Sequence, residues 1–339
     1  MIKILCFHNA TNRASFRYRV EQFLPYWSDK NIEMQTVCIS GIEYVNLLRL
    51  LFTLHKYDYV LLQKKIIPRV LINIITKQAK LIYDFDDALY SRESRELEQG
   101  KASPHGTIKK LNHILKKSTF VFAGSPELAR YSENFNNNVH IIPTALEKQQ
   151  AKTTLPPQSS CVTIGWIGND VNLFYLSTID DATLFLQQKY PAIRFSLLCG
   201  NPPQGLKTLW DFVPWSQETE TEWLHSIDIG IMPLTDDAWS RGKCAFKLLQ
   251  YMACEKPLVA SDVGANKTAV SDSVNGYLTR TTEEWIDALE LLILNREKRI
   301  RMGQESLKIF MEQFERSRIQ QKITDILFSS ANNRSEKTS

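Results

Sequence analysis

One segment of the chain combines cations with a helical pattern in a way that suits the binding of a phosphate group. It spans residues 241–254, and an apolar run typical of a buried strand follows at residues 257–261. On a helical period, Lys243, Lys247 and Gln250 share one face of the expected helix. Two ammonium groups near a helix N-terminus repel each other unless an anion binds there. The segment therefore predicts a diphosphate site, and the competing interpretation is a solvated basic helix face.

Three carboxylates follow an apolar, strand-like run in the first half of the chain. They are Asp84, Asp86 and Asp87, and the run before them covers residues 81–83. Gathering three negative charges beside a buried strand costs free energy unless hydrogen bonds or cations compensate them. We therefore expect these carboxylates to accept hydrogen bonds or to pair with cations. A metal site is the competing interpretation.

Alternating strand-like and helical patterns position these residues, and the alternation runs through the chain twice. The apolar strand runs of the first half lie at residues 2–7, 34–39, 59–62, 81–83, 120–123 and 139–142. Those of the second half lie at residues 162–167, 194–199, 227–232 and 257–261, with helical patterns at 172–189, 218–226, 243–254, 282–295 and 297–315. This alternation is typical of parallel sheets covered by helices, whose ligands bind beyond the carboxyl ends of the strands. The predicted fold class is therefore α/β, with two doubly wound, Rossmann-like domains that face a cleft.

Domain boundaries are expected where these patterns stop. A polar segment at residues 147–160 is typical of a linker, so the prediction is an N-terminal domain at residues 1–150 and a C-terminal domain at residues 151–315. Residues 316–330 are predicted to form a closing helix outside the second core, and residues 331–339 a disordered polar tail.

Composition argues against several classes of protein. The chain has 339 residues, of which 43% are apolar and 23% are charged, and this suits two ordinary globular domains. Its six cysteines form no CxxC pair, so neither a disulfide framework nor a zinc site is expected. The first residues lack the pattern of a signal peptide, and no apolar run approaches the roughly 18 residues of a membrane span. A cytoplasmic protein is the expectation.

Positive charge is concentrated in the first half of the chain. Residues 1–150 hold 21 Lys and Arg against 14 Asp and Glu, whereas the remaining residues hold 20 against 23. Cations alternate with bulky apolar residues at 47–56, 64–77 and 109–117, which suits peripheral attachment to an anionic membrane surface. The alternative is that these segments are ordinary amphipathic helices packed on a sheet. Nucleic acid is not expected as a partner, because no nucleic-acid-binding module accompanies the charge.

The order of motifs in the second half resembles the C-terminal domain of bacterial family 4 (group 1) glycosyltransferases. These motifs are the strand and turn ending at Gly168, the strand at 227–234, the helix at 243–254, the strand at 258–261, the loop at 263–266 and the turn at 275–278. Residues 14–20 and 83–88 are similar to the N-terminal domain of one branch of that family. The resemblance implies a GT-B fold, including a closing helix that returns to the N-terminal domain. It also implies a nucleotide-sugar donor in the C-terminal domain, an acceptor in the N-terminal domain, retention of anomeric configuration, and no obligatory metal or other cofactor.

The chain departs from the family pattern at an acidic pair. The family's Glu-x7-Glu motif, which contacts the donor sugar and the ribose, falls on Gly242 and Gln250, and neither residue is acidic. The amide of Gln250 still suits ribose hydroxyl groups. Contacts to the sugar are then left to backbone groups or to neighbours such as Trp239 and Ser240.

A second departure concerns the cations of the donor site. The family's Arg and Lys after the first C-terminal strand are missing, because Asn169 and its neighbours occupy that place. Lys243 and Lys247, with Arg241 in reserve, are the expected replacements. A leaving nucleoside diphosphate gains negative charge as the glycosidic bond breaks, so fixed cations lower the barrier without a divalent ion.

The resemblance and the residue types complete the predicted site. Asp86 falls where many relatives place a histidine beside the donor sugar, so the expected catalytic residues are Lys243, Lys247 and Asp86. The donor-binding residues expected besides those named above are Gly168, Asn169, Val213 and Trp215, the last two for the nucleobase. The expected acceptor-binding residues are Arg17, Arg19, Asp87 and His8. Surface ion pairing is the alternative for the two arginines, and a place in the core is the alternative for Trp215.

These features together predict a metal-independent, retaining glycosyltransferase of the hexosyl type. It would transfer a sugar from a nucleotide-diphosphate donor to a glycan or lipid-linked acceptor in the biosynthesis of cell-surface polysaccharide such as lipopolysaccharide. One alternative is a GT-B nucleotide-sugar epimerase or hydrolase. The other is a catalytically silent GT-B protein that binds a nucleotide sugar, which the missing acidic pair favours.

Overall fold

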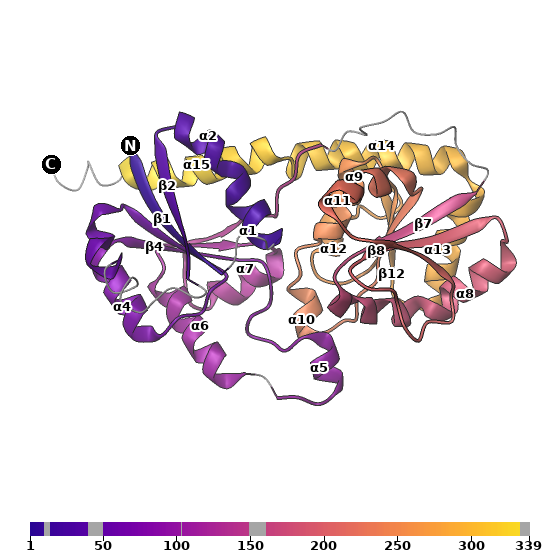
Figure 1. Cartoon of the computed structure of the whole chain (residues 1–339), viewed down its shortest axis with the longest axis horizontal. Coiled ribbons are helices and arrows are strands. Elements are labelled where there is room, and N and C mark those ends of the chain that lie inside the picture. Colours follow the sequence, from indigo (N-terminus) through magenta and orange to yellow (C-terminus); the bar gives the residue numbers. More distant parts are fainter. Residues whose placement is uncertain (10–13, 40–49, 103, 149–160, 333–339) are drawn as a thin grey trace. The chain divides into compact units, whose positions relative to one another are not determined.

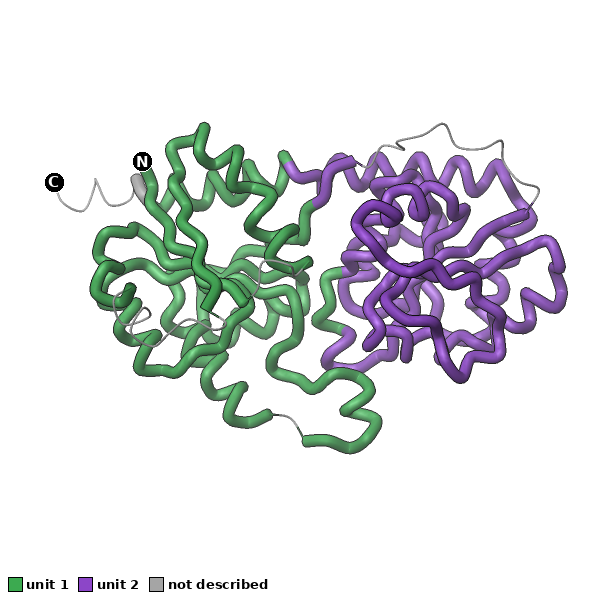
Figure 2. Tube along the Cα trace, viewed as in Figure 1, with its two compact units in different colours: residues 1–145, 241–244, 317–339 green, residues 146–240, 245–316 purple. Residues whose placement is uncertain are grey.

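The chain forms two β-sheets, each built of parallel strands (Figure 1). The computed structural model describes residues 1–9, 14–39, 50–102, 104–148 and 161–332. It divides into two units, each with one six-stranded sheet and its helices (Figure 2). Unit 1 comprises residues 1–145, 241–244 and 317–339, and unit 2 comprises residues 146–240 and 245–316. The predicted α/β class with two doubly wound parallel sheets is confirmed.

The sheet of unit 1 has the strand order β2-β1-β3-β4-β5-β6, and all its strands are parallel. The strands are β1 (Ile2–His8), β2 (Ile32–Cys38), β3 (Tyr59–Gln63), β4 (Lys80–Phe85), β5 (Phe120–Ala123) and β6 (Val139–Ile141). The α-helices of this part of the chain include α1 (Ala14–Arg19), α2 (Leu24–Asp29), α4 (Arg69–Gln78), α5 (Ser94–Glu98), α6 (His105–Lys117) and α7 (Pro126–Glu133). Short 3₁₀ helices lie at η1 (Glu21–Phe23) and η2 (Leu54–Lys56). The strand order reverses between β1 and β3, and open α/β sheets bind ligands beyond the carboxyl ends of their strands at such a switch point.

The last helix of the chain completes the core of unit 1. This helix, α15 (Arg316–Asn332), is the yellow helix that lies with the strands of unit 1 in Figure 1. Its buried side chains Ile319, Ile323 and Leu327 join the apolar cluster that contains β1 and β3. Their spacing of four residues places them on one helix face, which explains why this segment packs on a sheet. Residues 331 and 332, predicted to begin a tail, still belong to the helix, and residues 333–339 lie outside the described residues.

The sheet of unit 2 has the strand order β12-β11-β10-β7-β8-β9, also parallel throughout. The strands are β7 (Val162–Ile167), β8 (Ile193–Cys199), β9 (Trp210–Pro214), β10 (Ile229–Met232), β11 (Leu258–Ser261) and β12 (Gly276–Thr279). The helices are η3 (Asp170–Ile179), α8 (Asp180–Lys189), α9 (Gln217–Ser226), α10 (Ala238–Arg241), α11 (Phe246–Ala253), α12 (Asn266–Ala269), α13 (Thr282–Leu294) and α14 (Arg296–Gln313). The strand order reverses between β7 and β10, which makes the carboxyl ends of these strands the switch point of this sheet.

Several elements differ from the sequence-based expectations. Strands β9 and β12 were not predicted, because each is short and partly exposed and so carries no strong apolar pattern. The helix expected at residues 172–189 is a 3₁₀ segment followed by α8. The first unit ends at Ala145, and the expected linker at 147–160 lies outside the described residues from residue 149 onward.

The basic segments of unit 1 use their apolar side chains in the core. Ile72 and Ile75 of α4, and Leu111 and Ile114 of α6, are buried. The apolar faces of α4 and α6 therefore pack in the core, as expected if these segments are ordinary amphipathic helices on a sheet. Among the described residues, we find no helix long and apolar enough to cross a membrane.

Candidate active site

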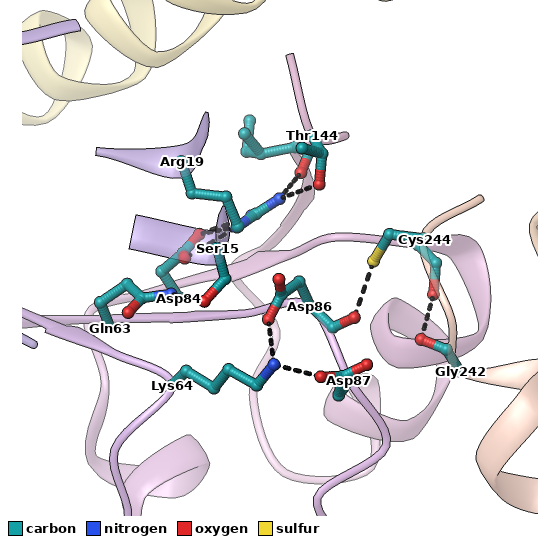
Figure 3. A network of polar contacts seen from close by, with 12 residues as sticks. Ser15, Arg19, Gln63, Lys64, Asp84, Asp86, Asp87, Thr144, Gly242 and Cys244 are labelled. Carbon is teal, nitrogen blue, oxygen red and sulfur yellow. Dashed lines mark hydrogen bonds and ion pairs between the residues drawn. The ribbon is translucent and has the colours of Figure 1, made fainter. Parts of the chain in front are cut away.

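A buried ion pair lies beneath the carboxyl edge of the sheet in unit 1 (Figure 3). Arg19 Nε donates to Asp84 Oδ2 at 2.8 Å, and Nη2 donates to Oδ1 at 2.5 Å. Arg19 Nη1 donates to the carbonyl oxygen of Ile142 at 2.9 Å and approaches Thr144 Oγ1 at 3.5 Å. Burial alone would lower the pKa of Arg19, but the Asp84 carboxylate raises it well above the ordinary value. The expectation that Arg19 binds an acceptor is therefore wrong, because its donors are committed to the interior.

A second cation, Lys64, follows strand β3, the neighbour of β4 in the sheet. Lys64 Nζ lies 3.0 Å from Asp86 Oδ1 and also pairs with Asp87 (Figure 3). Its backbone has a φ of 53°, the left-handed region that L-residues rarely occupy, and its N–H donates to the Asp84 carbonyl oxygen at 2.7 Å. The chain thus turns sharply at the end of β3 and brings the ammonium group to the two carboxylates. The ion pairs just named join three carboxylates to two cations at a partly exposed edge.

These charges keep Asp86 ionised. Burial raises the pKa of Asp86, but the Lys64 ammonium and the Arg19 guanidinium lower it further, so that it lies below its ordinary value. The pKa of Lys64 moves the other way, because Asp86 and Asp87 outweigh the burial that would lower it. The three carboxylates are therefore paired with cations, which is one of the two compensating arrangements that the sequence analysis expects. Within the described residues, no group of three or more His, Cys, Asp and Glu side chains has the arrangement of a metal site.

The segment Arg241–Cys244 belongs to unit 1, and its residues Gly242 and Cys244 lie beside this cluster (Figure 3). The thiol of Cys244 donates to the carbonyl oxygen of Asp86 at 3.0 Å. Gly242 is buried, and a Cβ there would lie 2.6 Å from the Cβ of Ala88. A glutamate at Gly242 has no room in this arrangement. This close packing gives a steric reason for glycine at this position.

The predicted helix face of two lysines does not form. Helix α11 begins at Phe246, and Ala245 before it has a left-handed backbone with a φ of 53°. Lys243 consequently precedes the helix and lies in unit 1, whereas Lys247 lies on the helix in unit 2. The sequence predicts a helix that starts three residues too early, because no helix-breaking residue follows Lys243 and Cys244 and alanine, at position 245, is a strong helix former. The inference of a shared helix face was wrong.

Lys247 reaches the switch point of unit 2. Its Nζ lies 4.7 Å from the ring centroid of Trp166 on β7. A Cβ on Gly168 would lie 2.9 Å from Lys247 Cε, so a side chain at that position would displace the lysine. Asn169, next in the chain, is exposed. The structure thus brings Gly168 and Lys247 together and fixes a cation beside the carboxyl end of β7, where an anion would be stabilised.

A carboxylate that the sequence analysis missed joins two of the predicted donor residues. Glu220 on α9 accepts from Trp215 Nε1 at 2.7 Å and from Gln250 Nε2 at 2.8 Å. Trp215 follows β9 and is 43% exposed, which excludes the interpretation of this residue as core. Gln250 is only 4% exposed, so its amide serves Glu220. Val213 on β9 is half-buried two residues before Trp215.

The other predicted residues are spread over both units. Ser240 is buried, and its hydroxyl group bonds with Tyr175 OH at 3.0 Å, so it offers no surface to a sugar. Trp239 is half-buried and donates its backbone N–H to Asp237, while Arg241 is exposed at the end of α10. His8 is 1% exposed and stacks on Phe16 with ring centroids 3.9 Å apart, so its side chain is buried in this structure. Arg17 lies over the ring of Tyr18, 5.4 Å from its centroid.

Lys64 and Glu220 are the two functional candidates that sequence reasoning did not place in the site. Lys64 was assigned to a membrane-facing patch, although it follows β3 directly, as Asp86 follows β4. That position after a buried strand was the available signal. Glu220 had no comparable signal, because its partners are five and thirty residues away in the sequence.

Unit 2 carries a recognisable domain. Residues 163–295 match the family described as glycosyl transferases group 1. The matched segment contains Gly168, Trp215, Glu220 and Lys247, the residues just described at the carboxyl edge of the second sheet. No curated protein matches the chain.

The whole chain is similar in fold to solved GT-B structures. Anabaena HepE in complex with UDP-glucose superposes with a TM-score of 0.72 at 14% identity, over 97% of this chain and 100% of HepE. Sucrose-phosphate synthase from Thermosynechococcus elongatus gives 0.72 at 12% identity, again over 97% and 100%. A variant of S. aureus TarM, solved with UDP, alpha-GlcNAc-glycerol and fondaparinux, gives 0.62 at 14% identity, over 83% of this chain and 58% of TarM. At these identities the similarity establishes the GT-B fold.

We expect Lys64→Met to destabilise the protein at pH 7 by roughly 2–4 kcal/mol, because it leaves two partly buried carboxylates on a single edge without their cation. The low pKa of Asp86 stabilises the folded state above the unfolded pKa of about 4, and this stability is lost as the pH falls through the folded pKa. The deficit of the variant should therefore shrink below about pH 4. Urea unfolding at several pH values measures it. Lys65→Met is the matched control, and equal effects of the two substitutions at pH 7 would refute the assignment.

Proposed function

We propose that the chain is a retaining glycosyltransferase that uses a nucleotide-diphosphate sugar as donor and a glycan or lipid-linked hydroxyl group as acceptor. The observation that carries this proposal is the placement of Lys247 against Gly168 and Trp166, within the segment that matches group 1 glycosyl transferases. HepE, which shares the fold, was solved with UDP-glucose. Cell-surface polysaccharide such as lipopolysaccharide is the proposed pathway, and a hexose the proposed sugar.

The donor end of the reaction belongs to unit 2. Lys247 would neutralise the diphosphate, whose charge grows as the bond to the sugar breaks. The Trp166 ring lies beside the ammonium group, and the lack of a side chain at Gly168 leaves room for the lysine there. A cation held in place before the reaction costs no reorganisation when the charge develops, so Lys247 stabilises the transition state more than the bound donor.

The acceptor end belongs to unit 1 in this proposal. Asp86 and Asp87 are held by one ammonium group at the carboxyl edge of the sheet, one strand from the switch point. Ionised carboxylates accept hydrogen bonds from sugar hydroxyl groups, and their negative charge favours the positive character that a sugar acquires during transfer. We assign Asp86 to the reacting sugar and Asp87 to the acceptor.

A catalytically silent, nucleotide-sugar-binding protein is the second candidate. Gly242 and Gln250 replace the acids that the resemblance leads one to expect, and the structure leaves no room for a side chain at Gly242. Turnover of a nucleotide sugar with any acceptor distinguishes the two candidates, because the silent protein binds the donor without consuming it.

Peripheral attachment to an anionic membrane is part of the proposal. Lys109, Lys110, Lys116 and Lys117 of α6 are exposed. Lys64 drops out of the basic surface, because it is paired with Asp86 and Asp87. Such a surface would bring the enzyme to a lipid-linked acceptor.

Lys247→Ala should lower kcat/KM for the donor by roughly 10²-fold or more, the scale for removing one preorganised charge-stabilising group. Steady-state kinetics with UDP-glucose first, and then with GDP-, ADP- and CMP-linked sugars, measures this loss. Lys207→Ala is the control, because Lys207 pairs with Asp181 at an exposed position. A folded Lys247→Ala variant with wild-type turnover would exclude the proposed diphosphate site.

Turnover should survive excess EDTA, because Lys247 takes the place of a divalent ion at the diphosphate. The measurement is UDP release before and after chelation. Loss of activity that Mn²⁺ or Mg²⁺ restores would assign a metal to the reaction, and Asp86 and Asp87 would then be candidate ligands.

Co-sedimentation with vesicles tests the membrane surface. The protein should pellet with anionic vesicles at low salt, less so as salt rises, and not with neutral vesicles, because salt screens surface charge. Lys109→Glu combined with Lys110→Glu should abolish pelleting while donor binding persists. Equal pelleting with neutral and anionic vesicles, or none with either, would return these lysines to an ordinary solvated helix face.

A further inference from the structure

Glu220 occupies a position in unit 2 that neither the family resemblance nor the sequence motifs assign. It lies one turn into α9, whose N-terminus is fixed by a capping box between Ser216 and Thr219. Trp215 precedes that cap, and its backbone N–H donates to the Cys199 carbonyl oxygen at 2.8 Å. The position of Trp215 is therefore set from both sides, by the end of β8 and by the side chain of Glu220.

The carboxylate of Glu220 receives two hydrogen bonds on separate oxygens. Oε2 accepts from the indole of Trp215 at 2.7 Å, and Oε1 accepts from the amide of Gln250 at 2.8 Å. A carboxylate accepts on both oxygens, whereas an amide of the same shape accepts on one and presents N–H donors on the other side. Only an acidic residue therefore satisfies both partners at once.

This arrangement holds the indole by its N–H while much of the Trp215 residue stays exposed to solvent. Trp215 is 43% exposed, which is unusual for an indole whose N–H is already satisfied by the protein. A rigid, partly exposed aromatic face is suited to stacking on a planar ring, because little conformational entropy is lost on binding. Such stacking accepts any nucleobase, since every base has a π-face.

The distance along the sheet fits one nucleotide. Trp215 follows β9, and Gly168 follows β7, with β8 between these strands. Neighbouring strands lie about 4.8 Å apart, so the ends of β7 and β9 are roughly 10 Å apart. That span suits a nucleoside whose base lies at one end and whose phosphates lie at the other. Gln250 and Lys247 both belong to α11, so Glu220 also connects the two ends of the span.

We propose that Glu220 is a positioning residue that holds the indole of Trp215 as the stacking surface for the donor's nucleobase. Gln250 is then engaged by Glu220 and not by the ribose. The inference rests on the proposed function, in that it takes a nucleotide sugar as the ligand of unit 2.

Calorimetric binding of UDP to the full chain tests the proposal without any need for turnover. Glu220→Gln should weaken UDP binding about tenfold, within the range for loss of one base-stacking contact, and leave the affinity for pyrophosphate within about twofold. Glu222→Gln, an exposed position on the same helix, is the matched control and should change neither. Far-ultraviolet circular dichroism and the melting temperature confirm that each variant is folded.

A second background separates positioning from a purely structural role. In a Trp215→Ala protein, where UDP binding is already weakened, Glu220→Gln should cause no further loss, because Glu220 acts through the indole. An equal loss in both backgrounds, or an equal loss for UDP and pyrophosphate, overturns the inference. UDP binding that behaves as expected in a protein without transferase activity overturns the proposed function alone. A wild-type protein that binds none of UDP, GDP and ADP overturns both.

Discussion

The ion pair between Arg19 and Asp84 sets the conditions for the carboxyl edge of the first sheet. Both side chains are almost completely buried, and the guanidinium also donates to the carbonyl oxygen of Ile142. Removing one partner would leave an uncompensated charge in the interior at a cost of about 3–5 kcal/mol. Helix α1, strand β4 and the chain after β6 must therefore stay together. Asp86 lies two residues after Asp84 and forms a second ion pair, with Lys64, next to this one (Figure 3).

Unit 2 solves a similar problem with hydrogen bonds in place of a buried ion pair. Glu220 joins Trp215 after β9 to Gln250 on α11, and Lys247 on the same helix lies over Trp166 of β7. The polar groups at this edge thus restrain one another across three strands of the sheet. A site that binds a charged, flexible nucleotide gains from such preorganisation, because the protein has less freedom to lose on binding.

The departures from the acidic pair that the resemblance leads one to expect have physical explanations. Gly242 packs against Ala88, where a Cβ would already be too close, and the segment around it is anchored by the bond from Cys244 to Asp86. At the second position, Gln250 donates to a carboxylate from another helix. A glutamate at this position would place two carboxylates in contact, so Glu220 and an acid at position 250 are alternatives. In both places, the residue of this chain suits its neighbours better than the family's acid would.

The sequence by itself determined the α/β class, most of the strands, the closing helix segment and the two edges at which charged residues gather. Those features depend on local periodicity and on the rule that parallel strands end at one edge, and both are visible in a single chain. The tertiary structure alone decided which charged residues form ion pairs with one another. Arg19 at the end of α1 and Lys64 after β3 are both basic residues near apolar runs, yet one is enclosed with Asp84 and the other pairs with two carboxylates. The left-handed backbone at Ala245, which separates Lys243 from the helix of Lys247, also has no mark in the sequence. Ion pairs and backbone turns of this kind depend on residues distant in the chain, and no local pattern reports them.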